Sequence, residues 1–292
     1  MKLGFIGFGE VGYEISKGLK KEGCSGIIAF DPMANDPGYG KLIAKRAKEA
    51  DVCLLSGPTE VAAQADVIIA AVPGSKSLQA ALGAIAALDS SKVYVDVSTC
   101  SPNTKKKIAE AVGSKGATFV DCALMGALTL HQHKVPAIVS GSGSDKFMQL
   151  MKPYHMALSK ISEIPGDAIA LKLIRSIYMK GLATLSVEML EAASTLKVEP
   201  LVLKSIGGSI NAATFEEMLN FLVTASAIHA ERQAHEMSDV MEMLVEIGVD
   251  PTMTEATKKR LEWLKSKRLK EKFQGVQPAK WEDVVQAWNS ES

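Results

Sequence analysis

Short apolar runs alternate with helix-like stretches along the first half of the chain. In chain order these runs are LGFIGF, GIIAFD, DVCLLS, ADVIIAAVP, KVYVDVS, TFVDCALM and PAIVSGS. Such alternation is typical of repeated βαβ units. Val, Ile and Ala dominate the runs with little polar alternation, which indicates strands buried on both faces. We therefore expect an α/β domain with a largely parallel, doubly wound sheet.

The pattern changes beyond Pro165. From Asp167 to about Leu196, apolar residues recur at helical spacing without a proline, which predicts one long helix. Further helices are expected at 201–209, 213–247, 252–266 and 280–289. No convincing strand is expected in this part. The sequence therefore predicts two domains, an α/β domain over residues 1–163 and an all-helical domain over residues 164–292.

A glycine-rich turn joins the first apolar run to the first predicted helix. It reads Gly7-Phe8-Gly9-Glu10-Val11-Gly12. A dinucleotide site needs a tight turn at Gly7, backbone close to the pyrophosphate at Gly9 and close helix–strand packing at Gly12. The pyrophosphate would lie on the helix N-terminus. The glycines could instead make only a tight turn, but the strand before them and the helix after them favour a Rossmann-type cofactor site at these six residues.

Asp31 bears on the kind of nucleotide. It ends the second apolar run, about 20 residues after Gly12, the spacing expected for the acid that binds the ribose 2′-hydroxyl. A carboxylate there repels the 2′-phosphate of NADP, and Pro32 stands where an arginine would receive that phosphate. NAD is therefore the expected cofactor, and NADP is less favoured.

A second motif follows the fifth apolar run. Residues 96–102 read DVSTCSP, and with this element the chain resembles the β-hydroxyacid dehydrogenase family, which includes 3-hydroxyisobutyrate, tartronate-semialdehyde and 6-phosphogluconate dehydrogenases. The resemblance covers nearly the whole chain. It implies that Ser98 and Thr99 lie beside the nicotinamide and the substrate, and that Val72 and Pro73 form a hydrophobic loop over the cofactor. From the residues alone, Ser98 and Thr99 are equally consistent with a helix N-cap.

Lys172 lies near the start of the predicted long helix, within the apolar stretch AIALKLI. Members of the family carry their general acid/base lysine in the pattern G-x-x-x-x-x-K-x-x-N, which the segment from Gly166 to Arg175 resembles. Alcohol oxidation needs a base for the hydroxyl proton, and lysine serves only if its pKa falls from about 10.4 through burial or nearby cations. Arg175 and Lys180 would supply such cations, although a solvated charged face is the alternative. The resemblance implies that Lys172 is the catalytic acid/base.

Two positions depart from the family pattern. Arg175 stands where most members have Asn, and Met125 replaces the serine that holds the substrate carboxylate in the loop D-A-P-V-S-G-G. Gly126 keeps the glycine that lets the backbone approach a ligand. We expect Ser98, Met125 and Gly126 to contact the substrate, with Arg175 binding its acid group as a bidentate fork.

A third pattern, H-A-x-R-x-x-H-E, lies on a later predicted helix, where His229, Arg232 and either His235 or Glu236 share one face. It comprises His229, Arg232, His235 and Glu236. The pattern resembles a variant branch of the family with a distinct helical C-terminal domain, where K-x-x-R-S also occurs. We hypothesise that Arg232 and Glu236 contact the substrate and that His235 reaches the cofactor. A solvated helix face with i,i+4 pairs is an equal alternative.

Composition narrows the partners. The 292 residues include 33 Lys plus Arg and 33 Asp plus Glu, so the formal net charge is zero and no basic field favours nucleic acid or an anionic membrane. The four cysteines are scattered, and His131 and His133, which could border the pocket, lack a third ligand at a recognisable spacing, so no metal is expected. The N-terminal apolar run is too short for a signal or a membrane span, which favours a cytoplasmic protein.

These observations predict an NAD-dependent oxidoreductase acting on the CH–OH group of a small, anionic 3-hydroxy acid, or reducing the matching semialdehyde or keto acid. One alternative is imine reduction, although relatives that reduce C=N usually replace the catalytic lysine. Another is an inactive dinucleotide-binding sensor. Relatives pair through the helical domain, which implies a homodimer, and the stretch EMLNFLVTASAI would form either its interface or core.

Overall fold

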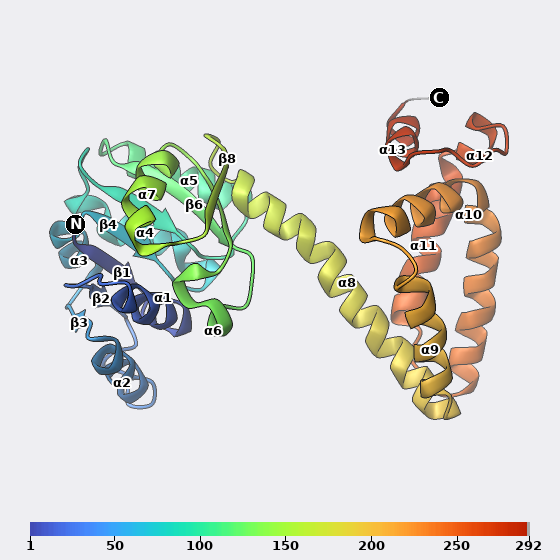
Figure 1. Ribbon diagram of the computed structural model, residues 1–292, viewed down its shortest axis with the longest axis horizontal. Helices are drawn as coiled ribbons and strands as arrows, with labels where there is room; N and C mark the ends of the chain where they lie inside the picture. Colours follow the sequence, from blue (N-terminus) through green and yellow to red (C-terminus); the bar gives the residue numbers. More distant parts are fainter. Residues whose placement is uncertain (291–292) are drawn as a thin grey trace. The chain divides into compact units, whose positions relative to one another are not determined.

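The computed structural model describes residues 1–290, which form two compact units (Figure 1). Unit 1 is Met1–Ser176, and unit 2 begins at Ile177. The change from one unit to the other falls inside the long helix α8 (Asp167–Leu196). The expected domain boundary at residues 163 and 164 lies just before that helix.

Unit 1 is built on an eight-stranded sheet. Its strands are β1 (Leu3–Ile6), β2 (Ile28–Phe30), β3 (Cys53–Leu54), β4 (Val67–Ala70), β5 (Val93–Asp96), β6 (Thr118–Leu124), β7 (Ala137–Ser140) and β8 (Leu158–Ser162). They lie in the order β3-β2-β1-β4-β5-β6-β7-β8. All neighbours run parallel except β6 and β7, which are antiparallel. The predicted doubly wound α/β sheet is confirmed, whereas β8 and the reversed direction of β7 were not predicted.

Helices cover both faces of this sheet. They are α1 (Glu10–Lys21), α2 (Gly40–Ala50), α3 (Pro58–Gln64), α4 (Ser77–Ala84), α5 (Pro102–Gly113), α6 (Leu128–His131) and α7 (Ser144–Met151). Successive strand residues point to opposite faces, so Phe5 packs with Ile15 of α1 on one side, while Ile68 and Tyr94 pack with Ile108 of α5 on the other. Two buried clusters, one on each face, therefore hold the strands and fix where their carboxyl ends lie.

Every secondary-structure element in the described part of unit 2 is a helix. It contains the rest of α8 together with α9 (Glu199–Ile210), α10 (Phe215–Glu246), α11 (Thr252–Ser266), α12 (Leu269–Lys272) and α13 (Trp281–Asn289). The predicted all-helical region is confirmed, and the short helix α12 was not predicted. Helix α10 begins with a capping box between Thr214 and Glu217, which satisfies two backbone N–H groups at its start.

Several large apolar side chains of unit 2 are exposed. They include Ile177 on α8, Leu201 on α9 and Phe221 on α10. The expected homodimer stays a prediction.

Within residues 1–290, no helix is both long enough and apolar enough to cross a membrane.

Candidate functional site

The glycine-rich turn between β1 and α1 has the geometry that the sequence predicted. Gly7 adopts φ +90°, and a Cβ there would lie 2.4 Å from the carbonyl oxygen of Ala71. A Cβ on Gly12 would lie 2.7 Å from the carbonyl oxygen of Gly7. A Cβ on Gly9, in contrast, would meet nothing within 4 Å. Gly7 and Gly12 are therefore required by the fold, whereas Gly9 leaves the start of α1 open.

The open start of α1 fits a dinucleotide. Gly9 is the N-cap of the helix and provides no side-chain cap, so the first backbone N–H groups lack that acceptor. Asp31 follows β2 directly, where it accepts hydrogen bonds from the backbone N–H of Phe8 at 2.6 Å and of Met33 at 2.8 Å. A pyrophosphate on the helix N-terminus and a ribose at the Asp31 carboxylate would be held by these residues.

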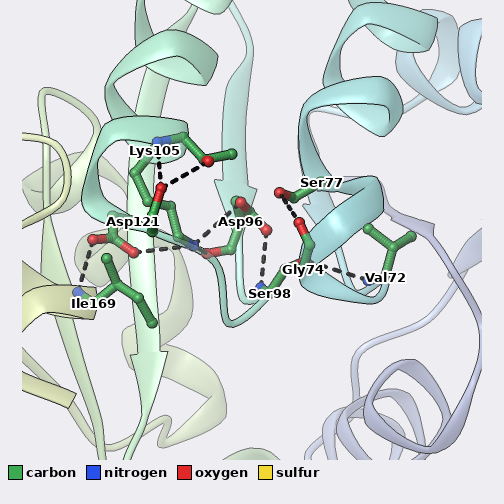
Figure 2. A network of polar contacts seen from close by, with 10 residues as sticks. Val72, Gly74, Ser77, Asp96, Ser98, Lys105, Asp121 and Ile169 are labelled. Atoms are coloured by element: carbon green, nitrogen blue, oxygen red, sulfur yellow. Dashed lines mark hydrogen bonds and ion pairs between the residues drawn. The ribbon is translucent and has the colours of Figure 1, made fainter. Parts of the chain in front are cut away.

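The loops after β4 and β5 lie against each other. The Ser98 hydroxyl accepts a hydrogen bond from the backbone N–H of Val72 at 3.4 Å (Figure 2). A Cβ on Gly74 would lie 1.9 Å from the carbonyl oxygen of Thr99, so only glycine permits this approach. Ser98 is buried, whereas Pro73 and Thr99 are exposed. The two loops that were expected beside the nicotinamide are thus adjacent.

The N-cap of α5 is Ser101, whose side chain accepts a hydrogen bond from the backbone N–H of Thr104 at 3.1 Å. The alternative interpretation of Ser98 and Thr99 as the N-cap is therefore wrong. Ser98 instead donates its backbone N–H to Asp96 Oδ1 at 2.9 Å. Its conformation is set by the strand that it follows and not by the helix that comes after it.

A buried group of charges lies between these loops and α8. Asp96 on β5 and Asp121 on β6 are register partners in adjacent parallel strands. Lys105 of α5 places its Nζ 3.2 Å from Asp96 Oδ2 and 3.0 Å from Asp121 Oδ1, and all three side chains are fully buried (Figure 2). Burial lowers the pKa of Lys105, but the two carboxylates outweigh it and raise that pKa above its ordinary value. Lys105 is therefore a cation.

Strands β6 and β7 fix the start of helix α8. The backbone N–H of Ile169 donates to Asp121 Oδ2 at 2.9 Å, and that of Ala168 donates to Ser140 Oγ at 3.1 Å. Gly166, at φ +100°, packs against Pro102 so closely that a Cβ would lie 2.9 Å from the Pro102 carbonyl oxygen. The start of α8 is thus in contact with β6, β7 and the first residue of α5.

Lys172 lies one helical turn beyond Ile169, on the same face of α8. Its side chain is half-buried. Burial raises the pKa of the Cys122 thiol to about 12, while the nearby cations Lys105 and Lys172 act in the opposite direction. Cys122 adjoins Asp121 on β6, the strand whose carboxylate accepts the Ile169 N–H at the start of α8.

The remaining predicted substrate residues are more dispersed. Met125 follows β6, is half-buried and donates its backbone N–H to the carbonyl oxygen of Pro136 at 2.7 Å. Gly126 and Arg175 are exposed. Their contact with a substrate stays a prediction.

The α10 residues lie in unit 2. His229, Arg232, His235 and Glu236 are all exposed, and Arg232 forms an i,i+4 ion pair with Glu236. This pair agrees with the alternative of a solvated helix face, and the pocket hypothesis stays a prediction. Among the described residues, no group of three or more His, Cys, Asp or Glu side chains could hold a metal ion.

Lys105 and Asp121 are functional residues that were not predicted from the sequence. Lys105 opens the run KKK, which is typical of a solvated helix. Its spacing to Ile108 and Val112 was nevertheless a usable signal, because residues i, i+3 and i+7 share one helix face and both apolar partners are buried. A lysine on the apolar face of a helix requires buried acceptors.

Comparison with known proteins agrees with this geometry. The family model for the NAD binding domain of 6-phosphogluconate dehydrogenase matches residues 2–166, and that for a domain of unknown function (DUF1932) matches residues 188–264. An uncharacterized 28.5 kDa protein of Methanothermus fervidus is 27% identical over 258 residues, which are 88% of this chain and 96% of that protein.

Two further relatives bear on activity and fold. Mitochondrial 3-hydroxyisobutyrate dehydrogenase of Mus musculus is 30% identical over 149 residues, which are 50% of this chain and 42% of that enzyme. The solved structure of conserved protein MTH1747, of unknown function and described as similar to 3-hydroxyacid dehydrogenases, is 30% identical with a TM-score of 0.60, covering 94% of this chain and 100% of that one. The chain therefore belongs to the family with the NAD binding domain of 6-phosphogluconate dehydrogenase, and it combines a 3-hydroxyacid dehydrogenase-like fold with a DUF1932 domain.

Proposed function

We propose that this protein is an NAD-dependent dehydrogenase that interconverts a small 3-hydroxy acid and the matching semialdehyde or keto acid, with Lys172 as the general acid/base. The observation that supports this most directly is the anchoring of α8. Asp121 and Ser140 accept the N–H groups of Ile169 and Ala168, so the helix that carries Lys172 starts from a fixed point on the sheet. A general acid/base needs such fixed placement within hydrogen-bond reach of the reacting hydroxyl.

In this proposal, different residues of unit 1 have different roles in the reaction. NAD, when bound, supplies the acceptor for the hydride that leaves the alcohol carbon. The Lys172 amine, in its neutral form, takes the hydroxyl proton, and as an ammonium it returns that proton in the reverse direction. Ser98, buried beside Val72, would orient the substrate hydroxyl. Hydride, proton and electrons are then balanced between substrate, cofactor and Lys172.

The acid group of the substrate would be held by a different set of residues. Arg175, one turn beyond Lys172 on the same helix, offers a bidentate fork to a carboxylate, phosphonate or sulfonate. The backbone at Met125 and Gly126 replaces the serine-containing loop of the relatives. A substrate chosen by Arg175 would be an anion of small size.

The test of this function is the Lys172→Ala variant. We first screen 3-hydroxy acids, sugar acids and their phosphonate or sulfonate analogues with NAD and with NADP, following NADH or NADPH absorbance. Lys172→Ala should then lose about 10²–10⁴-fold in kcat, the contribution of a general acid/base, while its Kd for NADH stays unchanged. Lys107→Ala, at an exposed lysine of α5, is the matched control.

Three outcomes would contradict the proposal. Near-wild-type turnover by Lys172→Ala would remove the acid/base role. Tight NADH binding without turnover on the whole panel would favour a cofactor-binding sensor, and turnover of imines alone would favour imine reduction.

A further inference from the structure

The most unusual side chain outside the predicted machinery is Lys105. It has no exposed surface, whereas its neighbours Lys106 and Lys107 on the same helix are exposed. An ammonium has three N–H donors. Lys105 Nζ has three acceptors in reach, namely Asp96 Oδ2, Asp121 Oδ1 and the carbonyl oxygen of Asp96 at 2.7 Å. It donates a hydrogen bond to that carbonyl oxygen, and its contacts with the two carboxylate oxygens are ion pairs.

The two carboxylates that meet Lys105 repel each other. Asp96 and Asp121 are register partners on β5 and β6, and like charges directly opposite on adjacent strands destabilise a sheet. Lys105, which contacts both carboxylates, removes that repulsion. Without the cation, either one carboxylate would take up a proton or the two side chains would turn apart.

Each carboxylate has a second task. One oxygen of each contacts Lys105, and the other accepts a backbone N–H from a different part of the site (Figure 2). Asp96 Oδ1 holds the N–H of Ser98, and Asp121 Oδ2 holds the N–H of Ile169. A single cation therefore fixes the orientation of both the Ser98 loop and the first turn of α8.

We propose that Lys105 is a positioning residue, which sets the distance between the Ser98 loop and the Lys172 helix by holding the Asp96 and Asp121 carboxylates in place. This inference rests on the acid/base function proposed for Lys172. Lys105 itself does not touch the reacting atoms. A misplacement of about 1 Å between reacting groups can cost about 100-fold in rate, so the effect should appear in turnover.

The experiment replaces Lys105 by a side chain of similar length without charge. Lys105→Met should lower kcat by about 10- to 100-fold, with less than about a threefold change in the Kd for NADH. The kcat of the refolded, monodisperse fraction of Lys105→Met is compared with the kcat values of two control variants. Lys106→Met lies at an exposed position, and Ile108→Ala opens a cavity in the buried face of the same helix. Ile108→Ala lowers the stability of the same helix face without removing the charge.

A second variant tests the charge argument when the first folds poorly. The double variant Lys105→Met/Asp121→Asn removes the negative charge of Asp121 together with the positive charge of Lys105. The amide introduced at position 121 keeps an oxygen that can accept the Ile169 N–H. We expect this double variant to recover kcat by at least about threefold over Lys105→Met, because the pair no longer repels.

The pH profile separates positioning from general stability. Other titratable groups around the pair are Tyr94, Cys100, Cys122 and Lys172. Burial raises the pKa values of Tyr94 and of both thiols, so these three stay neutral between about pH 5 and 8. A new ionisation in the kcat/KM profile of Lys105→Met within that range then reports the unbalanced carboxylate pair, and Ile108→Ala should keep the wild-type profile.

The outcomes are distinct. If Lys105→Met loses no more kcat than Ile108→Ala, keeps the wild-type pH profile and gains nothing from Asp121→Asn, the positioning role is refuted. If the wild type shows no turnover, the proposed function fails by itself. In that case the role of Lys105 is tested by chemical labelling, in which the rate of Lys172 modification by a limiting amine-reactive reagent is measured. Lys105→Met should change this rate by at least about threefold, and Ile108→Ala should leave it unchanged.

Discussion

Gly9 allows the cofactor site to be tested apart from the fold. Gly9→Ala adds one methyl group that would meet no heavy atom beyond its chain neighbours within 4 Å, at a backbone φ of −70°, outside the left-handed region that favours glycine. We expect the free energy of unfolding to change by at most about 1 kcal/mol, the size of an N-cap effect. The same methyl group stands at the open start of α1, where a pyrophosphate would approach the backbone.

The expected loss of binding follows from the hydrogen bonds at that helix start. A backbone N–H donated to a charged phosphate oxygen contributes about 1.5–3 kcal/mol. Losing one such bond corresponds to about a 10- to 100-fold higher Kd for NADH, since each 1.4 kcal/mol is about tenfold. Gly7→Ala should behave in the opposite way, because φ +90° and a Cβ 2.4 Å from the Ala71 carbonyl oxygen strain the fold itself.

The assay pairs urea unfolding with a fluorescence titration of NADH for both variants. Gly9→Ala should unfold at a urea concentration close to that of the wild type and bind NADH weakly, while Gly7→Ala should unfold much earlier. An unchanged Kd in a folded Gly9→Ala protein would show that the glycines make only a tight turn. A large loss of stability in that variant would refute the inference that the position is open.

Two further predictions concern the nucleotide and pH. Asp31→Asn should reduce the preference for NADH over NADPH by about tenfold or more in paired Kd measurements, because the charge that repels a 2′-phosphate is gone; an unchanged ratio would mean that Asp31 does not select the nucleotide. Burial lowers the pKa of His133 below its ordinary 6.5, despite the opposing effect of Glu22. The neutral His133 side chain therefore contributes its full stabilisation above about pH 6.5. This stabilisation is lost as the pH falls from 6.5 towards the pKa of His133 in the folded protein. Urea unfolding from about pH 7.5 to 5 should therefore show a steeper loss in the wild type than in His133→Gln, and equal slopes would exclude His133.

Much of the fold follows from the hydrophobic pattern. Strands such as β4 and β5 are apolar and buried at every position, so their runs stand out without a partner. Strand β8, LSKIS, alternates between half-buried and exposed residues at the edge of the sheet, and its polar residues hide it. The reversal of β7 has no local signal, because the direction of a strand depends on how the connecting segment crosses the sheet.

The candidate site also contains features that could be predicted from the sequence and features that could not. The glycine turn and Asp31 could be predicted because their geometry is local, a tight turn followed by an acid at a set distance. The Asp96–Lys105–Asp121 group could not, because Asp121 meets Asp96 only through the pairing of β5 with β6. The N-cap alternative for Ser98 failed for a different and local reason, because Ser101 directly precedes Pro102 and is the N-cap.

The buried charges serve the geometry of the site more than the stability of the fold. A buried ion group is often no more stable than apolar side chains of similar volume. Apolar replacements of Asp96 and Asp121, however, would leave the N–H groups of Ser98 and Ile169 without their acceptors, at a cost of about 1–3 kcal/mol each. Those two N–H groups begin the loop and the helix that carry the proposed chemistry. The pairing of β5 with β6, stabilised by Lys105, is thus the means by which the sheet determines where Ser98 and Lys172 lie.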